Sequence, residues 1–231
     1  MHDNLNKQNH GQGKVPGFPR LLAGQLSLDF VNSIDGRIGP HPQDFLTDAL
    51  SVVQWGYHVS LLSEAERDQL LLHLEHHPGE AASFFTQAIA LREALYRIVT
   101  TFVQQESPAP EDLDLLQREY TAGLSHAQLN AQGSGVGWHW PLTPDPRGLV
   151  WAIARSALEL LTSPELTRVR QCPGCDDCGW LFLDTSKGGK RQWCSMEGCG
   201  SRVKMRRLYQ RQQQKLPSTA TTPQKSERKS P

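Results

Sequence analysis

Five cysteines cluster in one short part of the 231-residue chain, and the remainder contains none. Zinc binds four thiolates in a tetrahedron, and two closely spaced pairs of cysteines let a short chain supply them. Cys194 and Cys199 form one pair, and Cys178 forms the other with either Cys172 or Cys175. The spacing predicts one structural Zn2+ ion, because four protein ligands leave no open position for catalysis at the metal.

The alternative to a metal site is a set of disulfides. Five is an odd number for a disulfide framework, and the N-terminus lacks the apolar segment of a secretory signal. No stretch is long and apolar enough to span a bilayer. We therefore expect a cytoplasmic protein with no membrane contact, in which clustered thiols bind a metal.

A run of basic residues follows the last cysteine, and two more precede Cys194. The set comprises Lys190, Arg191, Arg202, Lys204, Arg206, Arg207 and Arg211. Intervals of three or four residues place several of them on one face of a helix. This pattern favours contact with the phosphates of a nucleic acid. The alternative is that they only keep an exposed helix soluble.

Charge is divided unequally within a chain whose net charge is zero. Residues 1–167 hold 10 basic and 19 acidic side chains, a net of −9, whereas residues 168–231 hold 14 basic and 5 acidic, a net of +9. A polyanion would be repelled by the first part and attracted to the second. DNA is the favoured partner, with RNA as an alternative.

Composition divides the chain into four segments. Residues 1–17 and 216–231 are polar and predict a disordered leader and tail. Residues 18–165 predict a mostly helical domain with a small β-component, and residues 166–215 a small module that needs a metal for stability. The fold class is therefore α+β, with a treble-clef-like zinc finger at the C-terminal end.

Periodicity predicts the main elements. Alternating apolar residues over 21–32 indicate a strand, and a broad apolar stripe over 80–105 indicates a long helix. Segments 124–132 and 136–142 predict a β-hairpin with Trp138 and Trp140 on one face, and we expect both to belong to the core. In the finger, 179–183 and 191–193 predict a second hairpin.

Polar residues beside the expected first strand could line a ligand pocket. Asp29 and Asn32 are the candidates, and hydrogen bonding to the local backbone is the equally favoured alternative. The chain has no phosphate-binding glycine loop, nucleophile elbow or zinc-protease motif, so we expect no enzymatic activity.

Three motifs resemble the CGNR-type zinc finger: CGWLFLDTS at 178–186, RQWCSM at 191–196 and CGSR at 199–202. Ser201 stands where that family has Asn, although a hydroxyl can also cap a helix. The resemblance implies that Cys172 is the first ligand and Cys175 a spare thiol. Upstream, GQLSLDFVN at 24–32 resembles the bacterial ABATE-like domain, which is described as a stress-induced transcription regulator.

The resemblance implies a bacterial transcription regulator that binds DNA through a zinc-stapled basic helix. Its N-terminal domain would sense a small-molecule effector or form a homodimer. The alternative hypothesis is a zinc-stabilised protein-interaction adaptor, or an RNA-binding protein, without DNA specificity.

Overall fold

A computed structural model describes residues 15–174 and 177–215. Most of the predicted leader and all of the predicted tail lie outside these residues. The last part of the leader does have a structural contact, because the backbone N–H of Val15 donates to Nδ1 of His58 at 3.1 Å. The independent folding of segments 18–165 and 166–215 stays a prediction.

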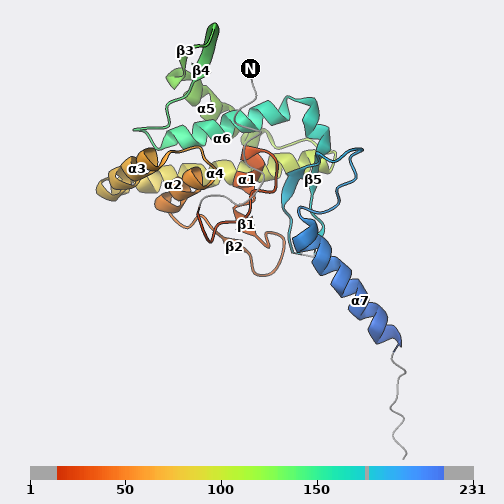
Figure 1. Cartoon of the computed structure of the whole chain (residues 1–231). Helices are drawn as coiled ribbons and strands as arrows, with labels where there is room; N and C mark the ends of the chain where they lie inside the picture. Colours follow the sequence, from red (N-terminus) through yellow and green to blue (C-terminus); the bar gives the residue numbers. More distant parts are fainter. Residues whose placement is uncertain (1–14, 175–176, 216–231) are drawn as a thin grey trace, which may run out of the picture.

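The elements confirm a mostly helical α+β fold (Figure 1). The helices are α1 (Leu26–Val31), α2 (Ala49–His58), α3 (Glu64–His76), α4 (Pro78–Val103), α5 (Pro110–His126), α6 (Arg147–Leu161) and α7 (Ser201–Lys215), with short helical turns η1 (Pro164–Arg168) and η3 (Met196–Gly200). The strands form three antiparallel pairs: β1 (Ile34–Asp35) with β2 (Gln43–Asp44), β3 (Gln128–Gln132) with β4 (Gly135–His139), and β5 (Val169–Gln171) with β6 (Leu181–Leu183). In this part of the chain no helix is long and apolar enough to cross a membrane.

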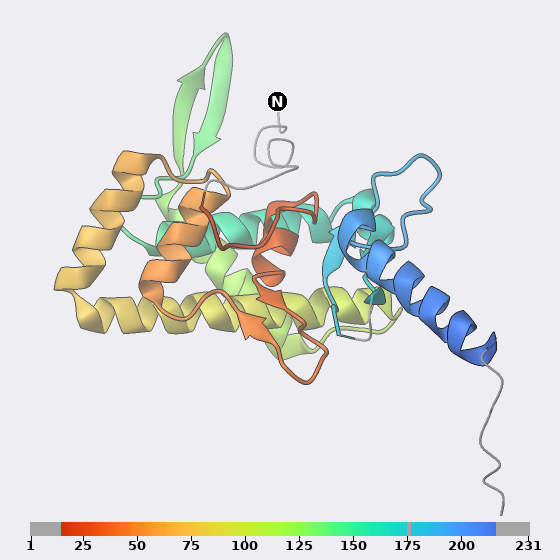
Figure 2. The same cartoon turned by 60° about the horizontal axis from the view of Figure 1, so that its bottom comes forward.

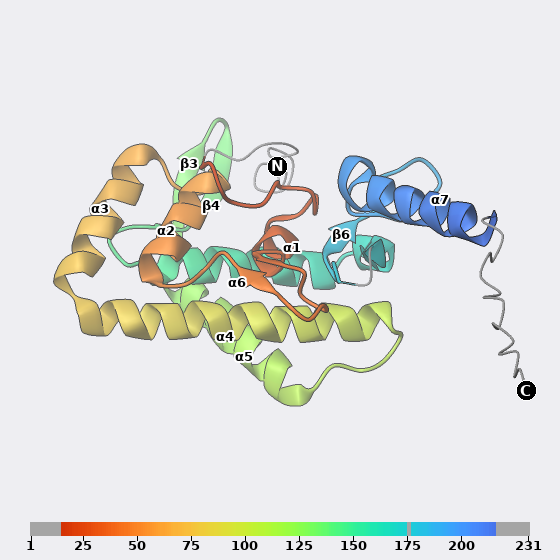
Figure 3. The ribbon, with the colours of Figure 1, turned by 90° about the horizontal axis from the view of Figure 1, so that it is seen from below.

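Helix α4 is the predicted long helix and forms the spine of the domain. It begins with Pro78, whose fixed φ suits the first helical position, and Glu80 lies near the positive end of the helix dipole. Its buried face includes Phe84, Leu91 and Leu95 at helical spacing. Figure 3 shows α4 running beneath α1 and beside α6, with α5 across it, so the core lies between these four helices.

The predicted strand over 21–32 is wrong, because this segment contains helix α1. Gln25 caps the helix, and its side-chain oxygen accepts the backbone N–H of Leu28 at 3.2 Å. Leu26, Ser27, Leu28 and Phe30 are all buried. A helix buried on nearly all sides has no polar face and so lacks the helical pattern of apolar residues. The alternation of apolar and polar residues is therefore no evidence for a strand here.

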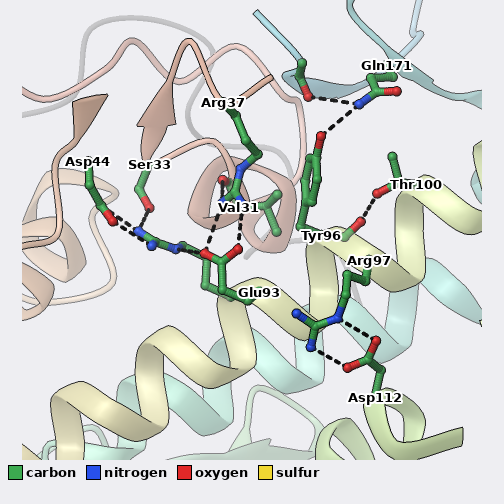
Figure 4. A network of polar contacts seen from close by, with 12 residues as sticks. Val31, Ser33, Arg37, Asp44, Glu93, Tyr96, Arg97, Thr100, Asp112 and Gln171 are labelled. Carbon is green, nitrogen blue, oxygen red and sulfur yellow. Dashed lines mark hydrogen bonds and ion pairs between the residues drawn. The ribbon is translucent and has the colours of Figure 1, made fainter. Parts of the chain in front are cut away.

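A polar network ties α4 to the β1–β2 loop (Figure 4). Buried Arg92 makes two 2.7 Å hydrogen bonds to the carboxylate of Asp44, which satisfies its charge. Burial alone would raise the pKa of Glu93, but the guanidinium groups of Arg37 and Arg92 hold it below its ordinary value. Arg37 also stacks 4.3 Å from the ring centre of Tyr96. The network therefore fixes a loop that contacts the cysteine region, where the backbone N–H of Ile38 donates to the carbonyl of Asp177 at 3.2 Å.

The hairpin expected over 124–142 is confirmed with shorter strands. Leu129 pairs with Trp138 and Ala131 with Val136 across β3 and β4. The expected burial of Trp138 is wrong, because 52 % of this residue is exposed. Figures 1 and 2 show the hairpin standing away from the helices, which explains the exposure.

Candidate metal centre and nucleic-acid interface

Strand β6 joins the cysteine region to the helical domain. Its partner is β5, with Val169 opposite Leu183, so the predicted pairing of 179–183 with 191–193 is wrong. The backbone N–H of Leu183 also donates to the carbonyl of Ala23 at 2.8 Å. Val169, Leu181 and Leu183 belong to the same apolar core as the helices. The finger is therefore built onto the helical domain.

Segment 184–193 is held by side chains instead of strand hydrogen bonds. The carboxylate of Asp184 accepts the backbone N–H groups of Ser186 and Arg191 at 2.9 and 3.1 Å. The hydroxyl of Ser186, followed by these backbone groups, lowers the pKa of Asp184, so the residue is anionic. The carboxylate of Asp184 thus accepts backbone N–H groups that strand-to-strand hydrogen bonds would otherwise satisfy.

Arg191 is an internal clamp, and its predicted contact with nucleic acid stays a prediction. Its guanidinium donates to the carbonyls of Leu22 and Trp193, each at 3.0 Å, and to the carbonyl of Cys194. It also stacks 4.4 Å from the ring centre of Phe182. These bonds use the guanidinium inside the protein and link the helical domain to a cysteine of the finger.

The structure brings four cysteines together in a buried cluster. The sulfurs of Cys172, Cys178, Cys194 and Cys199 all lie within 4.8 Å of one another. Those of Cys178 and Cys194 are 3.8 Å apart, and those of Cys194 and Cys199 are 3.6 Å apart. A tetrahedral zinc with metal–sulfur bonds of about 2.3 Å requires sulfurs about 3.8 Å apart. The donor set and its spacing therefore fit one zinc ion.

The thiols alone cannot all be ionised in this cluster. Hydrogen bonds from Cys178 and then Cys194 lower the pKa of Cys172, whereas the hydrogen bond with Cys172 raises the pKa of Cys178 and of Cys194. One thiolate is thus favoured at the expense of its neighbours. A bound divalent cation offsets two of the four negative charges and bonds to each sulfur, so a metal allows every sulfur to be deprotonated.

Gly174 shapes the turn between the first cysteines. A Cβ at this position would lie 2.7 Å from the sulfur of Cys199 and 3.1 Å from that of Cys172. The carbonyl of Gly174 accepts the backbone N–H of Cys178 at 3.2 Å. Gly174 was not predicted as a site residue, although a glycine among close cysteines is a usable signal for a tight metal loop. Cys175, the alternative ligand, lies outside the described residues.

Helix α7 starts directly at the metal cluster. Ser195 accepts the backbone N–H of Gly198 at 3.1 Å and so caps the short turn η3. Ser201, at the position of the family asparagine, instead donates to the carbonyl of Met196 at 2.9 Å. Arg202 donates to the sulfur of Cys199 at 3.5 Å. The first turn of α7 is thereby fixed by the cysteine loop and by a charged contact with a ligand sulfur.

The remaining basic residues lie where the sequence places them, on an exposed helix. Lys204, Arg206, Arg207 and Arg211 are exposed along α7, and Lys190 is exposed on the preceding loop. Figure 2 shows α7 projecting beyond the rest of the protein. A nucleic acid can therefore approach this helix without displacing another element.

A groove of about 550 Å³ lies on the finger itself. Its lining includes Arg170, Gln171, Lys190, Gln192 and Trp193. Arg170 and Trp193 were not predicted from sequence, because neither belongs to the basic run. A lining with three cations, of which Arg191 is already bonded internally, and an aromatic ring suits a phosphate next to a base or sugar.

The two candidate pocket residues have partners inside the protein. The amide of Asn32 donates to the carbonyl of Leu181 at 2.8 Å, and its oxygen accepts the N–H of Leu181 at 2.9 Å. Asp29 accepts the backbone N–H of Ala23 at 3.0 Å, and burial raises its pKa to about 7. Asn32 thus holds the domain to the finger, whereas Asp29 fixes the segment before α1, and an effector pocket stays a prediction.

Comparison with known families gives two matches. Residues 24–164 match the ABATE family, described as "Putative stress-induced transcription regulator", and residues 168–212 match the CGNR zinc finger. No curated protein matches the chain. Both resemblances inferred from the motifs are confirmed.

Proposed function

The chain belongs to the ABATE regulator family and ends in a CGNR zinc finger, and from this premise we propose that it binds duplex DNA through α7. The observation that carries the proposal is an exposed basic helix whose first turn is attached to the metal cluster. Because only the first turn of α7 is attached to the cysteine cluster, its later turns are accessible to a ligand. The surrounding charge of the C-terminal part attracts a polyanion.

The major groove of DNA is wide enough to admit one α-helix. Helical spacing places Lys204, Arg207 and Arg211 on one side of α7, whereas Arg202 and Arg206 lie on the other. A helix in the groove has a phosphate backbone on each side, so both sets can contact phosphates. Lys190 and Arg170 line the groove on the finger and add two cations outside α7.

The zinc ion has a structural role in this proposal. Four buried thiolates fill its coordination sphere, so no position is left for water or substrate. When bound, the metal supplies a rigid cross-link between the loop of Cys172 and Cys178 and the turn that starts α7. The proposal accordingly includes no enzymatic activity.

A salt-dependent binding experiment tests the proposal. Fluorescence anisotropy with labelled duplex DNA would compare wild type with the triple variant Lys204→Ala, Arg207→Ala and Arg211→Ala. Each lost phosphate contact should reduce the slope of log K against log salt by about 0.9, so the triple variant should lose about 2.7. The control replaces Gln210, Gln212 and Gln213 with alanine on the same helix and should keep the slope. Zinc content should be equal in all three proteins.

Two results would reject DNA binding as the function. One is a wild-type protein that holds zinc but shows no affinity for duplex DNA at low salt, and the other is an unchanged slope in the triple variant. Preference for structured RNA at fixed salt would identify RNA as the ligand.

The exposed Met205, Leu208 and Tyr209 on α7 favour the adaptor as the second candidate function. Capture of a partner protein that resists nuclease would support it.

A further inference from the structure

The hairpin of β3 and β4, residues 128–139, forms an arm with one apolar face. Residues that alternate along a strand share a face, and residues paired across two strands share it too. Leu129 pairs with Trp138 and Ala131 with Val136, so these four side chains lie on the same face. The polar residues Gln128, Asn130 and His139 occupy the opposite face.

This apolar face is open to solvent. Leu129 is 59 % exposed, Val136 is 74 % exposed and Trp138 is 52 % exposed. Trp140 lies at the base, where the guanidinium of Arg155 stacks 4.2 Å from its ring centre. The ring centres of Trp138 and Trp140 are 5.9 Å apart. The arm is thus anchored at its base, while its outer apolar residues have little cover.

An exposed two-stranded hairpin is marginally stable in water by itself. Proteins that must stay monomeric protect such edges with lysine, proline or a bulge. The five-pair register of β3 and β4 is regular, and residues 127–144 contain no Asp, Glu, Lys or Arg. The edges and the apolar face therefore lack the features that prevent association with an identical arm.

The charge distribution narrows the choice of partner. A nucleic acid would require cations on the arm, and a strongly charged protein would require an opposite charge there, but residues 127–144 carry neither. An identical arm presents the same uncharged apolar face, and two such faces can pack about a two-fold axis. We propose that the β3–β4 arm is a homodimerisation element whose partner is the arm of a second copy of this chain.

The small area of the arm favours a reversible dimer over a permanent one. A stable interface buries about 800 Å² on each partner, whereas a Trp side chain that is half exposed offers only about 100 Å². The arm alone falls short of the standard interface. We therefore expect a reversible dimer with a dissociation constant on the order of 10 µM.

Sedimentation velocity of the zinc-loaded full chain tests the proposal over about 1 to 200 µM, which brackets the expected constant. Wild type should change from monomer to dimer in this range. Leu129→Lys and Val136→Lys each place a cation in the apolar interface and should weaken the dimer at least about tenfold. The control Asn130→Lys adds the same charge to the opposite face and should change the constant less than about twofold. Monomeric wild type, or equal effects of all three variants, would overturn the proposal.

Hydrogen exchange of wild type gives a readout without any substitution. Backbone amides of 128–139 should become more protected as protein concentration rises, because pairing and packing exclude water from them. Exchange in the arm that does not depend on concentration would contradict the proposal. This measurement stays informative where a lysine variant disrupts the arm, and neither experiment depends on DNA binding.

Discussion

Replacing Asn32 with alanine should destabilise both parts of the protein at once. The amide of Asn32 makes two hydrogen bonds to the backbone of Leu181, which lies 149 residues further along the chain. Asn32 is 4 % exposed, and Leu181 is fully buried. Alanine would leave the N–H and the carbonyl of Leu181 without these partners in a site that water does not reach.

The expected cost follows from these two backbone groups. A buried donor or acceptor that loses its partner costs about 1–3 kcal/mol, so the loss of two partners should lower the free energy of unfolding by about 2–6 kcal/mol. This is a large part of the roughly 5–15 kcal/mol that stabilises a folded protein. Because β6 continues from Cys178, a displaced strand should also accelerate the transfer of zinc to a chelator.

Urea denaturation of the zinc-loaded protein and the rate of zinc transfer would measure both effects. Asn130→Ala is the matched control, because Asn130 lies exposed on the arm and its loss should change stability by less than about 0.5 kcal/mol. Asn32→Asp keeps the acceptor for the N–H of Leu181 but loses the donor, so it should also destabilise the protein. If Asn32→Ala were as stable as the control and released zinc at the wild-type rate, the proposed link between domain and finger would be wrong.

Three further predictions concern the metal loop, the clamp and the buried carboxyl group. Gly174→Ala should weaken zinc binding in competition with a chelator, because the added methyl collides with Cys199, and unchanged affinity would refute this crowding. Arg191→Gln should lower the free energy of unfolding by about 2 kcal/mol, because it removes internal hydrogen bonds. The slope of log K against log salt for DNA binding should stay unchanged, and a slope smaller by about 0.9 would mean that Arg191 contacts a phosphate. The pKa of Asp29 is about 7 when folded and 3.8 ordinarily, so the folded state retains a proton that the unfolded state loses, and stability should fall as pH rises from about 4 to 7. Asp29→Asn should abolish this fall, which the shift from 3.8 to about 7 puts at about 4 kcal/mol in urea denaturation at several pH values, and an identical pH profile would exclude the titration.

The metal site could be predicted from sequence because its information is local. Clustered cysteines with zinc-ligand spacing indicate the site directly, and the motifs around them identify the finger family. Helix α4 was predictable for a similar reason, since its buried stripe has one clear period. The start of α3 was likewise predictable, because its capping box, Ser63 and Glu66, is a motif only four residues long.

The errors arise where the structure depends on distant partners. Strand β6 pairs with β5 rather than with the segment after it, and no local pattern reports that choice. The internal bonds of Arg191 are of the same kind, because one of its carbonyl partners, Leu22, lies at the far end of the chain, and its predicted contact with phosphate is still untested. Trp138 was expected inside because of its residue type, whereas its exposure depends on where the arm points.

Strand β6 has consequences for exchanging modules between proteins. Its alternate residues serve two separate interiors: Leu181 and Leu183 face the helices, whereas Trp180 and Phe182 pack with the cysteines. Deleting one residue here would reverse every side chain and put each in the wrong interior. A chimera joined between residues 164 and 168 would separate β6 from Asn32 and from the apolar core that it contacts in this helical domain. This finger should therefore fold correctly only when it is fused to a helical domain that has an equivalent of Asn32 and an apolar surface for β6.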